Sequence, residues 1–246
     1  MSKLDKFRSS KKDKTEDVWS SIADLMSGLM IIFLLVSISF MLKTNEDKAN
    51  AVQTSATVKD IVNAYNKNKR DIYEDLVVAF GDKAKEWNMR IDEEDGTISF
   101  EEPDVLFDEG DDNVKPKFQA ILNEFFPKYI ETVYKGHKDS IKEIRIEGHT
   151  SSAWHENSTE LDAFFYNMEL SQDRTRKVLN YVMAIPQTKE YEEWLRKHMT
   201  ANGMSSSRIV IDKNGKEDPD KSRRVEFKII TNAEDTIGEI LNKVSE

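Results

Sequence analysis

The feature that most constrains this chain is an uncharged apolar stretch close to its N-terminus. Residues 25–42 contain no charged side chain, and about 18 predominantly apolar residues are enough for a helix to cross a bilayer. Trp19 precedes the stretch by more than one helical turn, where aromatic side chains mark the membrane–water interface. The sequence therefore predicts a transmembrane helix over residues 18–42, preceded by a tail over residues 1–17.

Asp24 stands immediately before the apolar stretch. A carboxylate costs about 2.5–3.5 kcal/mol near the centre of a bilayer and less near its surface. That cost is tolerable when the group faces a partner or a watery path and can take up a proton, so Asp24 is the candidate ion carrier of the span. The simpler alternative is that Asp24 caps the helix at the level of the lipid headgroups. Ser27, one turn further on, hydrogen-bonds either that carboxyl or the backbone of its own helix.

Basic side chains are distributed unevenly around the predicted span. Residues 1–17 carry six Lys or Arg, whereas residues 43–62 carry three. Because the more basic flank stays in the cytoplasm, we expect a cytoplasmic N-terminus and, in a bacterium, a single-pass inner-membrane protein with a periplasmic body. A cleaved signal peptide is disfavoured, because its apolar region is shorter and no small-x-small cleavage site follows Leu42.

The chain beyond the tail is acidic. The formal net charge is −10, and residues 1–17 contribute +2, which leaves −12 for the remainder. This balance argues against nucleic acid as a partner, because phosphate binding needs clustered Lys and Arg. Cysteine is absent, the four histidines lack metal-ligand spacing, and no glycine-rich phosphate loop or G-x-S-x-G turn occurs. We therefore expect no enzyme, no metal and no cofactor.

Residues 43–88 are predicted to form a helical linker or dimerisation region. Gly81 and Asp82 are expected to end its last helix. An apolar stripe at helical spacing needs a partner surface, and it consists of Ile72, Leu76, Ala79 and Phe80. That surface belongs either to the same chain or to a second copy, in a homodimer.

Residues 89–246 are predicted to form an α+β domain in which helices cover one face of a sheet. Asp95-Gly96 favours a hairpin between residues 89–92 and 97–100. Apolar spacing predicts helices over 117–134, 170–183 and 237–244, an inserted helical arm over 186–204, and strands over 141–147, 208–211 and 224–230.

Several ordered motifs in this domain resemble those of OmpA-like peptidoglycan-binding domains. They are Gly148-His149-Thr150, Asn167 with Leu170-Ser171-x-x-Arg174, and Ser222-Arg223-Arg224-Val225-Glu226, while Leu106-Phe107-Asp108-x-Gly110 resembles that family's opening strand and helix. The resemblance covers residues 97–231 and implies a βαβαβ domain that binds the peptide stem of the cell wall.

The resemblance also implies a binding site. Its residues are Thr150, Tyr166, Asn167, Leu170, Arg174 and Arg223. Arg174 presents a planar fork suited to a stem carboxylate, Asn167 suits stem amides, and Tyr166 and Leu170 form an apolar wall or simply pack. The family places Asp after G-H-T to take the stem's ammonium group, whereas this chain has Ser151. Either a carboxylate of the longer insertion (Glu156, Glu160 or Asp162) substitutes, or the ammonium group is recognised less strongly.

The N-terminal helix carries a second resemblance. Its pattern Ala23-Asp24-x-Met26-Ser27-x-x-Met30-x-x-Phe33-Leu34 is similar to the transmembrane helix of MotB-type stator subunits. Three features resemble the ZorB subunits of Zorya anti-phage systems more closely than flagellar MotB: Pro103-Asp104-x-Leu106-Phe107, the wide spacing from Thr150 to Asn167, and a serine-dotted span with Gly28.

This second resemblance implies a rotary motor in antiviral defence that is driven by the proton-motive force. Two copies of the helix are expected inside a ring of a ZorA-like multi-span subunit. Asp24 and Ser27 would lie on the path of the ion, a proton rather than sodium, and the outer domain would be anchored to peptidoglycan. The alternatives are a flagellar MotB-type stator subunit and a passive tether between membrane and wall.

Overall fold

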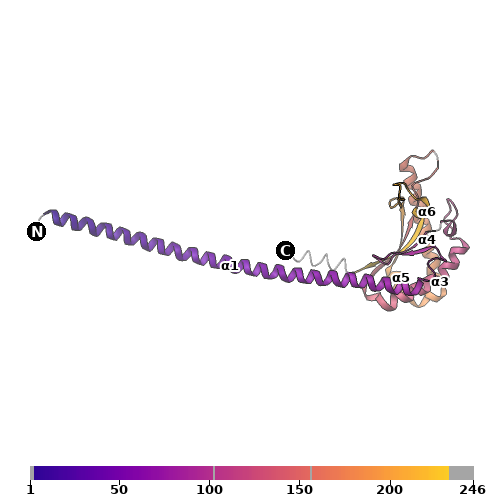
Figure 1. Ribbon diagram of the computed structural model, residues 1–246, viewed down its shortest axis with the longest axis horizontal. Coiled ribbons are helices and arrows are strands. Elements are labelled where there is room, and N and C mark those ends of the chain that lie inside the picture. Colours follow the sequence, from indigo (N-terminus) through magenta and orange to yellow (C-terminus); the bar gives the residue numbers. More distant parts are fainter. Residues whose placement is uncertain (1–2, 102, 156, 233–246) are drawn as a thin grey trace. The chain divides into compact units, whose positions relative to one another are not determined.

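The computed structural model describes residues 3–101, 103–155 and 157–232, so the predicted helix over 237–244 lies outside the described residues. The chain divides into two compact units, residues 1–59 and 60–246. Helix α1 (Lys3–Phe80) contributes residues to both units and ends where Gly81 was expected to stop it (Figure 1). The predicted domain bounds at residues 17, 42 and 88 remain predictions.

The first unit contains the apolar part of α1. Within the described residues, one helix is long and apolar enough to cross a membrane, with a mean hydropathy of 2.5 in its most apolar window. All side chains of residues 18–53 are exposed. Such a helix satisfies its own backbone hydrogen bonds and leaves an apolar surface for lipid or for a partner, as the sequence predicts for a span.

The second unit is built on a five-stranded sheet of order β1-β2-β5-β3-β4. Its strands are β1 (Met89–Ile91), β2 (Ile98–Phe100), β3 (Ile141–His149), β4 (Met199–Ser205) and β5 (Arg224–Thr231). Neighbours are antiparallel except β3 and β4, which run parallel. The predicted hairpin is confirmed as β1–β2, and Gly96 in its turn has a φ of +69°, which favours glycine.

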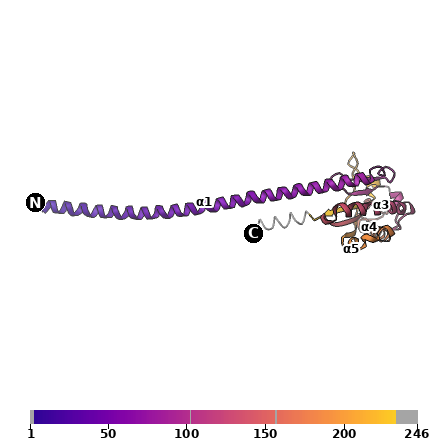
Figure 2. The ribbon, with the colours of Figure 1, turned by 90° about the horizontal axis from the view of Figure 1, so that it is seen from below.

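The longer helices α3 (Pro116–His137) and α4 (Glu160–Met183) pack on the apolar face of this sheet (Figure 2). The short helices are α2 (Pro103–Leu106), η1 (Lys138–Ser140), η2 (Pro186–Tyr191), α5 (Glu192–His198) and α6 (Pro219–Ser222). Phe125 of α3 lies 5.1 Å, ring centre to ring centre, from each of Phe80, Phe100 and Phe227. The predicted α+β class is therefore confirmed.

The apolar stripe at the end of α1 packs on its own unit. Ile72, Leu76, Ala79 and Phe80 are buried in the core shared with α3 and the sheet. This resolves the choice that the sequence left open for these four side chains, because they are already covered without a second copy of the chain.

One region of the sequence was interpreted wrongly. Residues 186–204 were predicted as a helical arm and 208–211 as a strand, whereas the arm is limited to η2 and α5 and the strand is β4. Strand β4 lacks an apolar alternation because α4 lies close against it. A Cβ on Gly203 would stand 2.4 Å from the backbone nitrogen of Gln172, so this position tolerates no larger side chain without a shift. Residues 208–211 contribute only an isolated bridge, between Ile211 and Glu217.

Helix α4 begins ten residues earlier than predicted. Thr159 is its N-cap, and its Oγ1 accepts a hydrogen bond of 3.2 Å from the backbone N–H of Asp162. This local signal, a threonine three residues before an acid, is a capping pattern. The extra turns carry Tyr166 and Asn167 on the helix rather than in a loop.

Candidate functional site

A cavity of about 350 Å³ lies where strand β3 ends. Residues of four separate segments border it: 106–110 at and after the end of α2, 148–155 at and after the end of β3, 167–174 in the middle of α4, and 223–225 at the start of β5. The segments that carry the G-H-T, N-x-x-L-S-x-x-R and R-R-V motifs therefore meet in space. The volume falls within the range of small-molecule sites, roughly 300–1,000 Å³.

The structure brings most of the predicted site residues together. Thr150, Asn167, Leu170, Arg174 and Arg223 border the cavity. Tyr166 does not border it and is half exposed, with its ring stacked on that of Trp154 at 5.6 Å between centres. The part that each of these residues plays in binding remains a prediction.

Arg174 holds the loop that follows α2. Its Nε donates to the backbone carbonyl of Asp111 at 2.8 Å and its Nη2 to that of Asp108 at 2.9 Å, while its guanidinium lies 4.8 Å from the ring centre of Phe107. These contacts occupy two of the five N–H donors. Burial and the neighbouring Arg223 cation lower the pKa of Arg174 to about 10, so the side chain remains a cation at neutral pH.

Polar groups of three residues on the cavity border have no hydrogen-bond partner among the described residues. They are the Nε of Arg223, the Oγ1 of Thr150 and both ring nitrogens of His149, and each of these atoms is buried. Arg223 is held at its other end, where Nη2 donates to Asp220 at 2.6 Å. A buried unsatisfied polar group is costly, and the guanidinium groups of Arg174 and Arg223 on the same border favour an anionic ligand.

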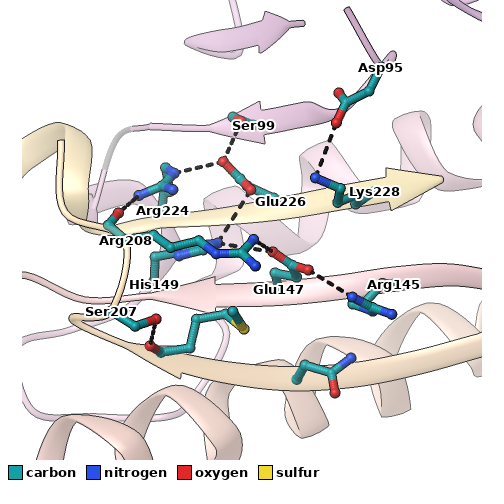
Figure 3. A network of polar contacts seen from close by, with 12 residues as sticks. Asp95, Ser99, Arg145, Glu147, His149, Ser207, Arg208, Arg224, Glu226 and Lys228 are labelled. Atoms are coloured by element: carbon teal, nitrogen blue, oxygen red, sulfur yellow. Dashed lines mark hydrogen bonds and ion pairs between the residues drawn. The ribbon is translucent and has the colours of Figure 1, made fainter. Parts of the chain in front are cut away.

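A network of buried charges lies on the polar side of the sheet (Figure 3). Glu147 of β3 stands directly opposite Glu226 of β5 in the sheet register. His149 lies between them, with its Nε2 at 3.3 Å from Glu226 and 3.5 Å from Glu147, at ion-pair distance but not aligned for a hydrogen bond. The arginines around the pair relieve what would otherwise be a repulsion of like charges.

Arginines complete this network. Arg224 Nε donates to Glu226 at 2.7 Å, and Arg208 Nη1 donates to Glu147 at 3.1 Å. Burial alone would raise the pKa of Glu226, but its contacts with His149 and Arg224 outweigh burial and hold that pKa far below its usual range. The network stabilises the strand end that carries the G-H-T motif.

By distance alone, Glu147, His149 and Glu226 could hold a metal ion, since their ligand atoms lie within 4.8 Å of one another. The charges around them argue otherwise. Arg145, Arg208 and Arg224 already contact the two carboxylates, and a divalent cation would add positive charge to a cluster that is compensated without it. The arrangement therefore fits an internal ion-pair network.

Two of the carboxylates considered as substitutes at Ser151, Glu160 and Asp162, do not border the cavity. Glu160 is exposed, and Asp162 accepts a hydrogen bond of 2.6 Å from Thr159 at the helix start. The third, Glu156, lies outside the described residues. Two other acids do border the cavity, Asp108 and Glu109.

Sequence reasoning missed Glu109. Asp108 is paired with Lys115 at 2.9 Å, whereas the exposed Glu109 makes no hydrogen bond or ion pair with any residue that the structure describes. Its signal was the acid-rich segment 108–112, of which only Asp108 and Gly110 were considered, as part of a motif. Glu109 is therefore the carboxylate best placed to meet a positive group of a ligand.

On the N-terminal helix, Ser27 bonds to the backbone of its own helix rather than to the carboxyl of Asp24. Its Oγ donates to the backbone carbonyl of Ala23 at 2.8 Å, the common behaviour of serine inside a helix. Asp24 is exposed. The role of both residues in moving an ion remains a prediction.

The fold and the site together define a protein with a helix of membrane-crossing length and an α+β domain whose cavity is lined by arginines. No family model matches the chain. The fold is similar to a putative MotB-like protein from Desulfovibrio vulgaris (20% identical, 70% of this chain, 94% of that chain, TM-score 0.44). It is also similar to the cell wall anchor of the T6SS from Pseudomonas aeruginosa (19% identical, 63% of this chain, 96% of that chain, TM-score 0.44).

A curated relative is much more similar in sequence. Zorya protein ZorB of Escherichia coli is 40% identical over 233 residues, which cover 95% of this chain and 96% of the relative. The chain therefore belongs to the ZorB family of Zorya proteins, and the resemblance indicated by its motifs is confirmed.

Proposed function

We propose that this chain is the stator-like subunit of a Zorya motor, anchored in the inner membrane by α1 and to peptidoglycan by its C-terminal domain, and that it acts in anti-phage defence. The membership of the ZorB family supports the setting. The basic tail supports a cytoplasmic N-terminus, with the predicted linker over 43–88 and the domain over 89–246 in the periplasm. Under this proposal the chain is not an enzyme.

The cavity is the observation that carries the wall-binding half of the proposal. Arg174 and Arg223 are two cations on one border of the cavity, and their guanidinium groups would meet a carboxylate of the peptide stem. Charge-assisted hydrogen bonds of this kind are the strong ones. Glu109 offers a carboxylate to the stem's ammonium group, in the role that Ser151 cannot fill.

The motor half of the proposal depends on Asp24. Two copies of α1 would stand inside a ring of a ZorA-like multi-span subunit, and Asp24 would take up and release a proton that enters from the periplasm. The membrane potential supplies about 2.3 kcal/mol per charge per 100 mV, which is enough to bias repeated loading in one direction. Ser27, bonded to its own helix backbone, would shape the helix surface next to the carboxylate.

Co-sedimentation of the full-length protein in detergent with purified sacculi tests the wall-binding half. Arg223→Ala removes a half-exposed cation from the cavity border and should weaken binding roughly tenfold or more, because a hydrogen bond to a charged group is lost. Arg176→Ala is the matched control: Arg176 lies on α4, pairs with Asp173 at 2.8 Å and does not border the cavity. Equal binding by Arg223→Ala and the wild type would show that the binding surface lies elsewhere.

A further inference from the structure

We infer that Trp154 forms a second subsite at the same cavity, which stacks against a sugar ring of the glycan strand while the arginines hold the peptide stem. The inference rests on the proposed binding of peptidoglycan. Trp154 belongs to the insertion between Thr150 and Asn167, and the sequence motifs do not include it.

Trp154 is positioned at the cavity by its own ring contacts. It borders the cavity together with His155, whose ring lies 5.5 Å away and nearly edge-on. Tyr166 stacks on Trp154 with an angle of 23° between the rings, yet does not itself border the cavity. Tyr166 therefore covers part of the indole, and the part of Trp154 that borders the cavity is open to a ligand.

The two residues before Trp154 are fixed by hydrogen bonds from different elements. The backbone carbonyl of Ala153 accepts from Nδ2 of Asn167, a side chain of α4 that is 3% exposed. The backbone N–H of Ser152 donates to Glu217 at 2.9 Å, and the Ser152 hydroxyl donates to the other oxygen of the same carboxylate. Trp154 is thus held in a preorganised place, which lowers the entropic cost of binding.

The fold does not use Trp154 for its core. The residue is half-buried and stands outside the hydrophobic core cluster, although a tryptophan is among the largest side chains available for burial. An aromatic side chain left partly exposed on the border of a polar cavity marks a contact surface.

A pyranose ring is the ligand group that fits this place. One face of the ring is lined by C–H groups, and these lie flat against the negative face of an aromatic ring. The peptide stem is attached to a sugar of the glycan, and one residue spans at most about 3.6 Å. A stem whose carboxylate lies against Arg174 and Arg223 therefore carries its sugar within a few residues' reach of the same cavity.

The test compares two soluble ligands on the full-length protein in detergent: a disaccharide-tripeptide muropeptide and the same tripeptide without sugars. Calorimetry should show that the wild type binds the muropeptide roughly threefold to tenfold more tightly, the gain expected from one stacked ring. Trp154→Ala should lose this gain and keep its affinity for the free tripeptide. Trp154→Phe should retain most of the gain, because it keeps a ring face.

Further variants separate this subsite from a general defect. Phe165→Ala, an exposed aromatic of α4 outside the cavity border, should bind both ligands as the wild type does. Trp154→Leu keeps apolar contact with Tyr166 without a ring face and replaces Trp154→Ala if that variant does not fold. The inference is overturned if the wild type binds both ligands equally, or if Trp154→Ala and Trp154→Leu lose both to the same degree. Wild-type protein that binds neither ligand would instead refute the proposed wall binding.

Discussion

The apolar helix and the cavity differ in how a sequence specifies a site. On the helix, every candidate group belongs to one continuous segment, and Asp24 and Ser27 are separated by less than one turn. At the cavity, the groups come from four segments, and Phe107 contacts Arg174 across 67 positions of the chain. The first site is defined by order along the chain and the second only by the fold.

The two regions also differ in what surrounds their polar groups. In the described chain, the apolar part of α1 is exposed, so under the proposed function the surroundings of Asp24 would come from lipid and partner subunits. The cavity residues are instead fixed by internal bonds, such as those from Arg174 to two loop carbonyls. A site that needs partners should respond to substitution without loss of folding, whereas a site built by the fold should couple binding to stability.

The largest effect is expected at Asp24. Asp24→Asn removes the only ionisable group available to the predicted span and should abolish ion flow and protection against phage. Assembly should persist, because the amide is nearly the same size. Ion flow can be measured in vesicles that hold this chain with the proposed ZorA-like subunit, and assembly by co-purification.

Two controls sharpen the test at Asp24. Asp24→Glu keeps the carboxyl and should keep part of the flow, and Ser27→Ala removes only a bond to the helix backbone and should have a small effect. A fully active Asp24→Asn variant would favour a passive tether.

The next largest effect is expected in the buried network. Glu226→Gln keeps the shape of the side chain but leaves Arg224 without its buried counter-charge at 2.7 Å. Breaking a buried pair from one side costs about 3–5 kcal/mol, which urea unfolding of the full-length protein would measure. Glu193→Gln, in an exposed pair with Lys197, should leave the unfolding midpoint unchanged. An unchanged midpoint in Glu226→Gln would contradict the stabilising role of the network.

The same carboxylate predicts how stability depends on pH. The pKa of Glu226 is lower in the folded protein than its ordinary value of 4.5. Its contribution to stability is therefore complete above about pH 4.5 and is lost as the pH falls from there through the folded pKa. The free energy of unfolding should fall with pH in this acidic window, and more steeply in the wild type than in Glu226→Gln.

Much of the fold could be predicted because its signals are local. The Asp95-Gly96 turn, the periodic apolar residues of α3 and the alternation in β3 and β5 each depend on a few neighbouring residues. Thr150, Asn167 and Arg174 could be placed in one site because they stand in ordered motifs. Their actual partners could not be foreseen, since backbone carbonyls of a distant loop have no signature in the sequence.

Trp154 and Glu109 were missed for a related reason. Neither residue stands in a periodic pattern. Trp154 is recognised by its stacking on Tyr166, and Glu109 by its position at the cavity, and both depend on the fold. Strand β4 was missed because it lacks the apolar alternation of a typical strand. Its residues are small where α4 packs closely against it. Here the packing of a neighbouring element, and not the strand's own propensity, selected the residue types.

The smallest effect is expected from a change in the packing of α4 against β4. Gly148 of β3 and Gly203 of β4 stand opposite each other in the register, beneath α4. Gly203→Ala would place a Cβ 2.4 Å from the backbone of Gln172, so α4 must move, at a cost of about 1–3 kcal/mol typical of overpacking. Because α4 carries Asn167 and Arg174 to the cavity, binding to sacculi should weaken together with stability. Asn202→Ala, the neighbouring position with a side-chain bond only to Thr200, should change neither, and a Gly203→Ala variant with wild-type stability would contradict the close contact between α4 and β4.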